Sequence, residues 1–192
     1  EPPLSEYERH NRELCQIRNF MRRKKKKNEY ERLFMESFPV FYQQCQMVSQ
    51  FLDEAGDPKG TIGICHGNFN QHNILFGNDR YAILNFERTG YRIQVMDLCN
   101  FMRKILEKHN WDKGLGLAMI REYEKSCPLT PGDRIQMYCR LAYPEKFWKL
   151  ANHYSASRKV WISGQSREKL KKEIRQNDSR CRYLGELREI LT

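Results

Sequence analysis

Three polar residues between positions 66 and 73 have the types and spacing of a loop that transfers phosphoryl groups. His66 is followed two residues later by Asn68, and Asn73 comes five residues after Asn68. In such a loop the middle position is an aspartate that accepts the proton of the attacking hydroxyl, and the third is an asparagine that holds magnesium. A second aspartate, about a dozen residues further on, holds magnesium against the nucleotide phosphates. Asn85 occupies that place, so both aspartate positions hold asparagine.

These two asparagines predict a loss of catalysis. The neutral amide of Asn68 is a negligible base at pH 7, whereas a positioned base contributes about 10²–10⁴ in rate. Asn85 offers magnesium an oxygen without the charge that hard cations prefer. Glu87 is a candidate replacement ligand, because residues i and i+2 of the expected strand share a face. His72 is a candidate base, with a loop histidine satisfied by backbone as the alternative, and Asn70 is expected to brace the loop through its side chain.

The surrounding pattern predicts a mainly α fold with a small β-hairpin region. Apolar residues at helical spacing, including Phe20, predict a helix over about the first 25 residues and another through the stripe at 34–52, which Pro39 should kink or break. Short β-prone runs at 61–65, 74–76 and 81–84 enclose a turn at 77–79. After Gly90 the pattern returns to helix. Further helices are expected at about 115–125, 131–141, 144–155 and 166–191. A core or an interface is expected from a group of aromatic residues: Tyr143, Phe147, Trp148, Tyr154 and Trp161.

Composition places the chain among soluble globular proteins. It has 192 residues, of which 40% are hydrophobic and 30% charged, and no apolar run approaches the ~20 residues of a membrane span. Seven cysteines without a Cys-x-x-Cys pair indicate buried thiols and therefore synthesis in the reducing cytoplasm. The net charge of +10 suits an anionic partner. The basic run 22–27 favours a solvated connection between helices, and nucleic-acid binding is the less favoured alternative.

Several separate segments carry a resemblance to a known family. The loop 65–76 and the segment Asn85-Phe86-Glu87 resemble the aminoglycoside phosphotransferase and choline kinase-like group of the protein kinase-like superfamily. Within this group the details are most similar to CotS-type spore coat proteins. The other segments that carry this resemblance are 10–14, the basic run 22–27, 101–111, 143–144, 147–152 and 161–164.

The resemblance implies the C-terminal lobe of a kinase-like fold, spanning residues 1–192 as a single lobe. The glycine-rich loop and strand lysine of an N-terminal lobe are absent from this chain. The resemblance also implies that His66 packs under the loop, and that Asp97 accepts hydrogen bonds from the loop backbone. Asn73, Asn85 and Glu87 would be the metal positions, with magnesium and ATP as cofactors if activity remains.

Three functions follow from these observations. The first is a catalytically degraded pseudo-phosphotransferase with a structural or scaffolding role, deposited in the spore coat with other coat proteins as partners and with weak nucleotide binding. The second is an active ATP-dependent phosphotransferase acting on a sugar, amino-sugar or protein hydroxyl. The third is a binder of anionic polymers through the basic run 22–27; nucleic acid and membrane are not expected as partners.

Overall fold

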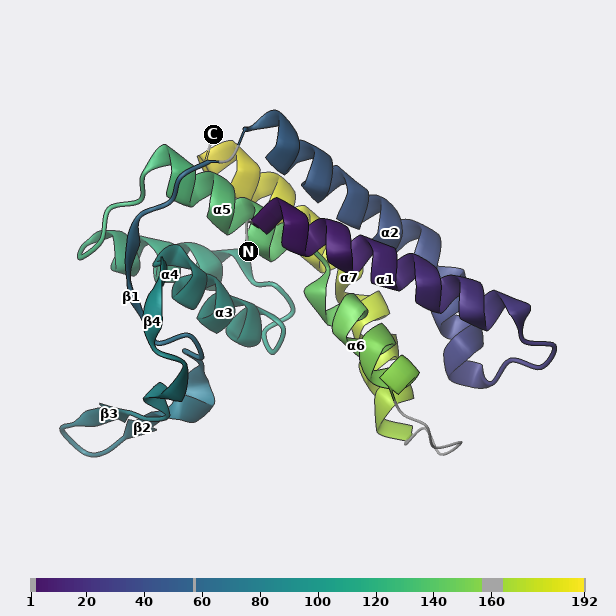
Figure 1. Ribbon diagram of the computed structural model, residues 1–192. Helices are drawn as coiled ribbons and strands as arrows, with labels where there is room; N and C mark the ends of the chain where they lie inside the picture. Colours follow the sequence, from purple (N-terminus) through teal and green to yellow (C-terminus); the bar gives the residue numbers. More distant parts are fainter. Residues whose placement is uncertain (1–2, 57, 157–163, 192) are drawn as a thin grey trace. The chain divides into compact units, whose positions relative to one another are not determined.

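The structure, a computed structural model, describes residues 3–56, 58–156 and 164–191 (Figure 1). By internal contacts the chain divides into two compact units. The first comprises Glu1–Asp57 with Ala142–Asp178, and the second comprises Pro58–Leu141 with Ser179–Thr192. The expectation of one kinase-like lobe over 1–192 stays a prediction. No helix in the described ranges has an apolar stretch long enough to cross a bilayer.

The first unit is helical and has an aromatic core. It contains α1 (Pro3–Arg23), α2 (Glu29–Glu54), α6 (Glu145–Ala156) and the first half of α7 (Gly164–Leu191). Phe147 of α6 is fully buried and stacks on two rings of α2, with ring centroids 4.9 Å from Phe34 and 4.4 Å from Phe41. Tyr143 stacks on Tyr7 of α1 at 4.4 Å. These contacts confirm the aromatic core; Trp161, which the sequence grouped with it, lies outside the described residues.

One sequence expectation about the first unit needs correction. Pro39 was expected to kink or break its helix; α2 continues through that residue, so the expected break is wrong. Its start is held by a capping box, in which Asn28 accepts from the Glu31 amide at 2.9 Å and Glu31 accepts from the Asn28 amide at 2.9 Å. Phe20, one of the apolar residues whose spacing predicted α1, is 57% exposed because it lies outside the face of α1 that Leu14 and Met21 bury.

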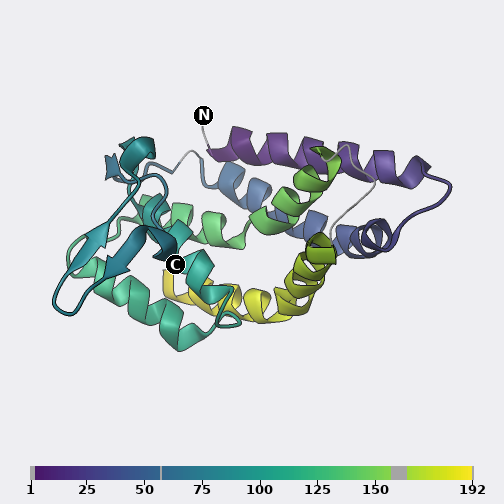
Figure 2. The ribbon, with the colours of Figure 1, turned by 90° about the horizontal axis from the view of Figure 1, so that it is seen from below.

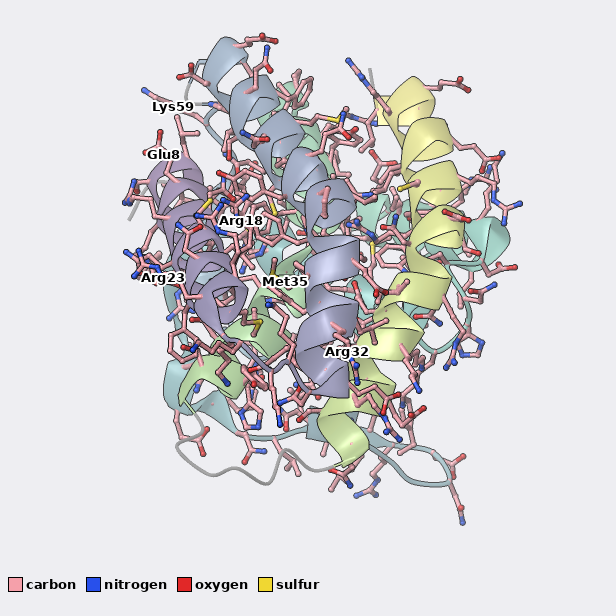
Figure 3. All side chains as sticks on the ribbon, turned by 90° about the vertical axis from the view of Figure 1, so that its right-hand side faces the viewer. Glu8, Arg18, Arg23, Arg32, Met35 and Lys59 are labelled. Carbon is pink, nitrogen blue, oxygen red and sulfur yellow. The ribbon has the colours of Figure 1, made fainter. Side chains whose placement is uncertain are left out.

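The basic run connects two helices, as the sequence favoured. It begins in the last turn of α1 and continues through residues 24–27 to the start of α2. Lys24 bridges Glu31 at 2.5 Å, and the Lys27 ammonium donates to the Lys24 carbonyl at 3.0 Å. Figure 3 shows this side of the first unit, with Arg23 on α1 and Arg32 on α2 labelled.

The second unit carries the strands found in the described residues. They are β1 (Ile62–Cys65), β2 (Ile74–Phe76), β3 (Tyr81–Ile83) and β4 (Gly90–Ile93), with short 3-10 turns at Gln71–Asn73 and Phe86–Arg88. The helices are α3 (Val95–Leu106), α4 (Lys113–Glu124), α5 (Pro131–Ala142) and the end of α7. β2 and β3 form the predicted antiparallel hairpin, which Figures 1 and 2 show as a ribbon of adjacent strands.

The strand β4 was missed by the sequence analysis, which expected helix directly after Gly90. β4 pairs antiparallel with β1, so that Ile64 lies opposite Tyr91 and Ile62 opposite Ile93. The pairing joins residues almost thirty positions apart, and such long-range partners leave little trace in local periodicity. The helix α3 therefore begins only at Val95, and its Cys99, Met102 and Leu106 are fully buried.

A buried carboxylate joins the start of β1 to the start of α5. Asp133 is 2% exposed and accepts from the Thr61 amide and hydroxyl, both at 2.7 Å, and from the Thr130 hydroxyl at 2.7 Å. Burial disfavours the charged form, but the hydrogen bonds from Thr130 and Thr61 outweigh it and lower the pKa of Asp133. The hydrogen bonds of Asp133 fix the start of β1 and hence the position of the loop that follows it.

Candidate functional site

Asp97, in the first turn of α3, fixes the backbone of the loop that follows β1. The two carboxylate oxygens of Asp97 accept from the backbone N–H groups of His66 at 2.6 Å and Gly67 at 3.0 Å. Gly67 has φ of +74°, and a Cβ there would lie 2.3 Å from the Arg88 carbonyl oxygen. Only glycine fits this position without a shift of backbone. The structure thus gives Asp97 the two backbone hydrogen bonds that the resemblance implied.

His66 lies under the loop and is 9% exposed. Its Nδ1 faces the Asn68 amide N–H at 3.2 Å, and its Nε2 faces the Leu84 carbonyl at 2.8 Å. An N–H can only donate and a carbonyl can only accept, so both contacts are satisfied by the neutral ring with its proton on Nε2. The ring of Phe86 packs 4.7 Å from the imidazole and that of Phe69 6.0 Å from it. This arrangement makes His66 a structural bridge from the loop to the end of the hairpin.

Asn68 stands at the base position, exposed to solvent. Its carbonyl accepts from the side-chain amides of Asn70 and Asn73, each at 2.8 Å, and its own side-chain oxygen accepts from Asn70 at 3.1 Å. Asn70 also caps the following turn by accepting from the His72 amide at 3.0 Å. The bracing expected of Asn70 is therefore present, and it orders a loop whose central side chain is a neutral amide.

The two metal positions, Asn73 and Asn85, are hydrogen-bonded to each other. Asn85 Nδ2 donates to Asn73 Oδ1 at 2.8 Å. The orientation of both amides follows from the network, because the Asn68 carbonyl accepts from Asn73 and so requires its NH2 group. The oxygen of Asn73 must then face Asn85, which must donate. Asn73 is 5% exposed, and Asn85 has φ of 65° and ψ of 62°, a left-handed conformation that asparagine tolerates better than most residues.

The side chains of the two candidate replacement residues, Glu87 and His72, lie outside the hydrogen bond between Asn73 and Asn85. Glu87 is exposed and belongs to the 3-10 turn Phe86–Arg88, because β3 already ends at Ile83. The argument that Glu87 and Asn85 share a strand face is therefore wrong. His72 is also exposed, and its Nε2 lies 3.0 Å from the side-chain nitrogen of its neighbour Gln71.

Magnesium, the ion that the resemblance implies, does not fit the donor set at these positions. Mg²⁺ binds through carboxylates and phosphates with near-ideal octahedral geometry. Here Asn73 Oδ1 accepts from an amide, and Asn85 directs its NH2 group toward Asn73, whereas the aspartate of a working loop offers only oxygens at this position. Throughout the described part of the chain, no three His, Cys, Asp or Glu side chains are grouped to hold a metal ion.

Sequence reasoning missed the direct link between the two metal positions. The signal was present, since an amide can donate where the aspartate it replaces can only accept. It also missed Phe69, whose ring packs 5.3 Å from that of Phe101 on α3 and so ties the loop to the helix. The Leu84 carbonyl, which accepts from His66, is a backbone group that residue type could not reveal.

Comparisons with known proteins identify the family and the fold. Residues 8–187 match a family described as "Spore coat putative kinase YutH". The fold is similar to that of an aminoglycoside phosphotransferase from Alicyclobacillus acidocaldarius subsp. acidocaldarius DSM 446, with a TM-score of 0.87 and 18% sequence identity. That match covers 100% of this chain and 59% of the phosphotransferase. No curated protein sequence matches. The predicted fold class, a mainly α kinase-like lobe with a small β region, is confirmed.

Proposed function

The chain belongs to the spore coat kinase family of the YutH type, and on this premise we propose that it is a structural component of the spore coat that has lost phosphotransfer. Its partners are then other coat proteins, and deposition in the coat follows synthesis in the cytoplasm. Magnesium and ATP have no part in this role.

The hydrogen bond from Asn85 to Asn73 carries the proposal. In a working phosphotransferase a cation draws the oxygens of these two positions together. In this chain the NH2 group of Asn85 supplies the positive partner for Asn73 Oδ1 at 2.8 Å. The loop is therefore closed by its own side chains and needs no ion to hold it.

The base position supports the same conclusion. A general base must be able to accept a proton within hydrogen-bond reach of the attacking hydroxyl. Asn68 cannot, and its side-chain oxygen already accepts from Asn70 at 3.1 Å. The contacts of Asp97 and His66 keep the loop in shape. The residues that hold the loop in shape are thus present, whereas both aspartate positions hold asparagine.

A paired measurement of metal binding and phosphate transfer tests the proposal. Mn²⁺, a spectroscopic substitute for Mg²⁺, would be titrated into the 192-residue protein and into the double variant Asn68→Asp, Asn85→Asp, with binding read from its EPR signal. Transfer from labelled ATP to sugars, amino-sugars and the protein itself would be followed in parallel. We expect no Mn²⁺ binding and no transfer by the parent, and measurable Mn²⁺ binding by the double variant.

Glu87 provides the decisive control, because it is the carboxylate two residues from Asn85. If the chain were an active enzyme using Glu87 as a ligand, Glu87→Gln would abolish transfer. The structural role predicts that Glu87→Gln leaves both folding and incorporation into the coat unchanged. Phosphate transfer by the parent that is lost in Glu87→Gln would overturn the proposal.

A further inference from the structure

The positive charge of the chain is concentrated in two short segments of the first unit. Residues 22–32 contain seven basic and two acidic side chains, and residues 167–175 contain five basic and two acidic ones. These twenty residues therefore carry +8 of the chain's formal charge of +10. Both segments belong to the first unit by its internal contacts. Positive charge gathered in this way raises the local concentration of anions.

Ion pairs bring the two segments together. Glu29, the first residue of α2, accepts from the Arg167 guanidinium at 2.5 Å and lies 3.4 Å from the Lys171 ammonium, both on α7. Lys27, the last residue of the basic run, comes two positions before Glu29. Figure 3 shows the start of α2, where Arg32 is labelled, beside the first turns of α7. The basic run and the first turns of α7 therefore lie at the same end of the unit.

The carboxylates at this end are already paired. Glu31 binds Lys24, and Glu168 lies 3.3 Å from Arg167 and 3.5 Å from Lys171. Within the described residues, in contrast, eight basic side chains of the two segments make no ion pair: Arg22, Arg23, Lys25, Lys26, Arg32, Lys169, Lys172 and Arg175. Their charge is left for a partner from outside this end of the unit.

Three of these eight cations line a hollow on α7. The hollow has a volume of about 460 Å³, and the residues that line it are Gln165, Glu168, Lys169, Lys172 and Arg175. Lys169, Lys172 and Arg175 follow one another at intervals of three residues, so they are successive neighbours on the helix surface. The charge of Glu168 is offset by Arg167 and Lys171, which leaves the hollow positive.

The lining of the hollow distinguishes among anionic partners. Its volume is in the range of sites for small ligands and is far too small for a nucleic-acid duplex. None of the described lining residues is aromatic, so no ring is offered on which a nucleobase could stack. Protein–protein interfaces are centred on apolar and aromatic side chains and are depleted of lysine. Arginine and lysine donors, in contrast, suit phosphate oxygens. A compact ligand with several phosphate groups fits this lining best.

We propose that the hollow on α7 binds a compact polyphosphate, with Lys169, Lys172 and Arg175 as the residues that contact it. The basic run draws anions toward this end of the unit. The site is separate from the loop that holds Asn68, Asn73 and Asn85. The inference therefore stands whether or not the chain transfers phosphate.

Calorimetric titration of the 192-residue protein with inorganic tripolyphosphate in EDTA tests the proposal, because it measures binding without metal and without phosphate transfer. We expect the parent to bind one tripolyphosphate per chain. The triple variant Lys169→Gln, Lys172→Gln, Arg175→Gln should bind it at least about tenfold more weakly, because three charge-assisted contacts are lost. Glutamine suits a helix about as well as lysine and arginine do. A short DNA duplex, titrated in parallel, should bind the parent more weakly than tripolyphosphate does.

A second triple variant, Lys104→Gln, Lys108→Gln, Arg121→Gln, supplies the matched control. These three side chains are exposed in the other unit, so their replacement lowers the net charge equally without touching the hollow. This variant should bind tripolyphosphate like the parent, and both variants would be checked for folding by circular dichroism and urea denaturation. The proposal is overturned if the parent does not bind tripolyphosphate, if the two triple variants weaken binding equally, or if the duplex binds the parent more tightly than tripolyphosphate does.

Discussion

Replacing Asn85 by aspartate tests most directly whether a side-chain amide has taken the place of a cation. The variant cannot donate to Asn73 Oδ1, so the 2.8 Å hydrogen bond is lost and two oxygens face each other. Asn73 is 5% exposed, which limits how well water can replace the donor. Leaving a buried acceptor unsatisfied costs roughly 1–3 kcal/mol. Because Asn85 itself is exposed, we expect a destabilisation at the lower end, about 1–2 kcal/mol.

The assay is urea denaturation of parent and variant, each in EDTA and in Mg²⁺. In EDTA the variant should unfold at lower urea than the parent. The new carboxylate and the freed oxygen of Asn73 give Mg²⁺ two donors, so the ion should restore stability to the variant. At a Mg²⁺ concentration ten times the dissociation constant this restoration amounts to about 1.4 kcal/mol. The parent should unfold at the same urea concentration with and without Mg²⁺.

Asn78→Asp is the matched control for this experiment. Asn78 is exposed in the turn between β2 and β3, so its replacement changes the net charge equally without touching the amide pair. It should leave stability and Mg²⁺ response unchanged. The reasoning is refuted if Mg²⁺ stabilises the parent, or if Asn85→Asp is as stable as the parent in EDTA.

Three further predictions concern the parts that hold the loop and the core. Asp97→Asn should destabilise the protein by roughly 1–3 kcal/mol in urea denaturation and speed hydrogen exchange at the His66 and Gly67 amides, which lose a charged acceptor. Asp133 has a folded-state pKa below its usual value of 3.8, so its contribution to stability is present above that value and is lost as the pH falls through the lowered pKa. Urea midpoints measured across this window should therefore vary less with pH in Asp133→Asn than in the parent. Phe147→Ala, which removes a fully buried ring stacked on two others, should cost about 3–5 kcal/mol in urea denaturation.

Local patterns in the sequence were sufficient for the helices and the hairpin. The stripe through α2, the turn after Phe76 and the first-turn proline of α5 all report on neighbours within a few residues. The strand β4 was missed because its only reason to be extended is β1, almost thirty residues away. Pro39 does not break α2, although a break was one of the two outcomes that its residue type predicted.

The positions of the candidate site and the contacts of Asp97 and Asn70 were predictable, but the hydrogen bond between Asn73 and Asn85 was not. Spacing located His66, Asn68, Asn73 and Asn85, because loops of this kind have defined residue types at fixed intervals. Residue type alone could not say whether the two amides at the metal positions would point oxygens at a common ion or bond to each other. That choice depends on the Asn68 carbonyl, a backbone group that fixes the orientation of Asn73.

The amide pair between Asn73 and Asn85 also bears on how such a loop evolves. Once the hydrogen bond holds the loop, selection no longer keeps a metal-binding carboxylate for the sake of stability, and the base at position 68 can drift freely. The return path is harder, because Asn85→Asp alone breaks the bond without restoring a base, and Asn68→Asp alone supplies a base without a metal anchor. Under the proposed structural role each single step is without benefit, so the amide pair would hold such a loop in a non-catalytic state.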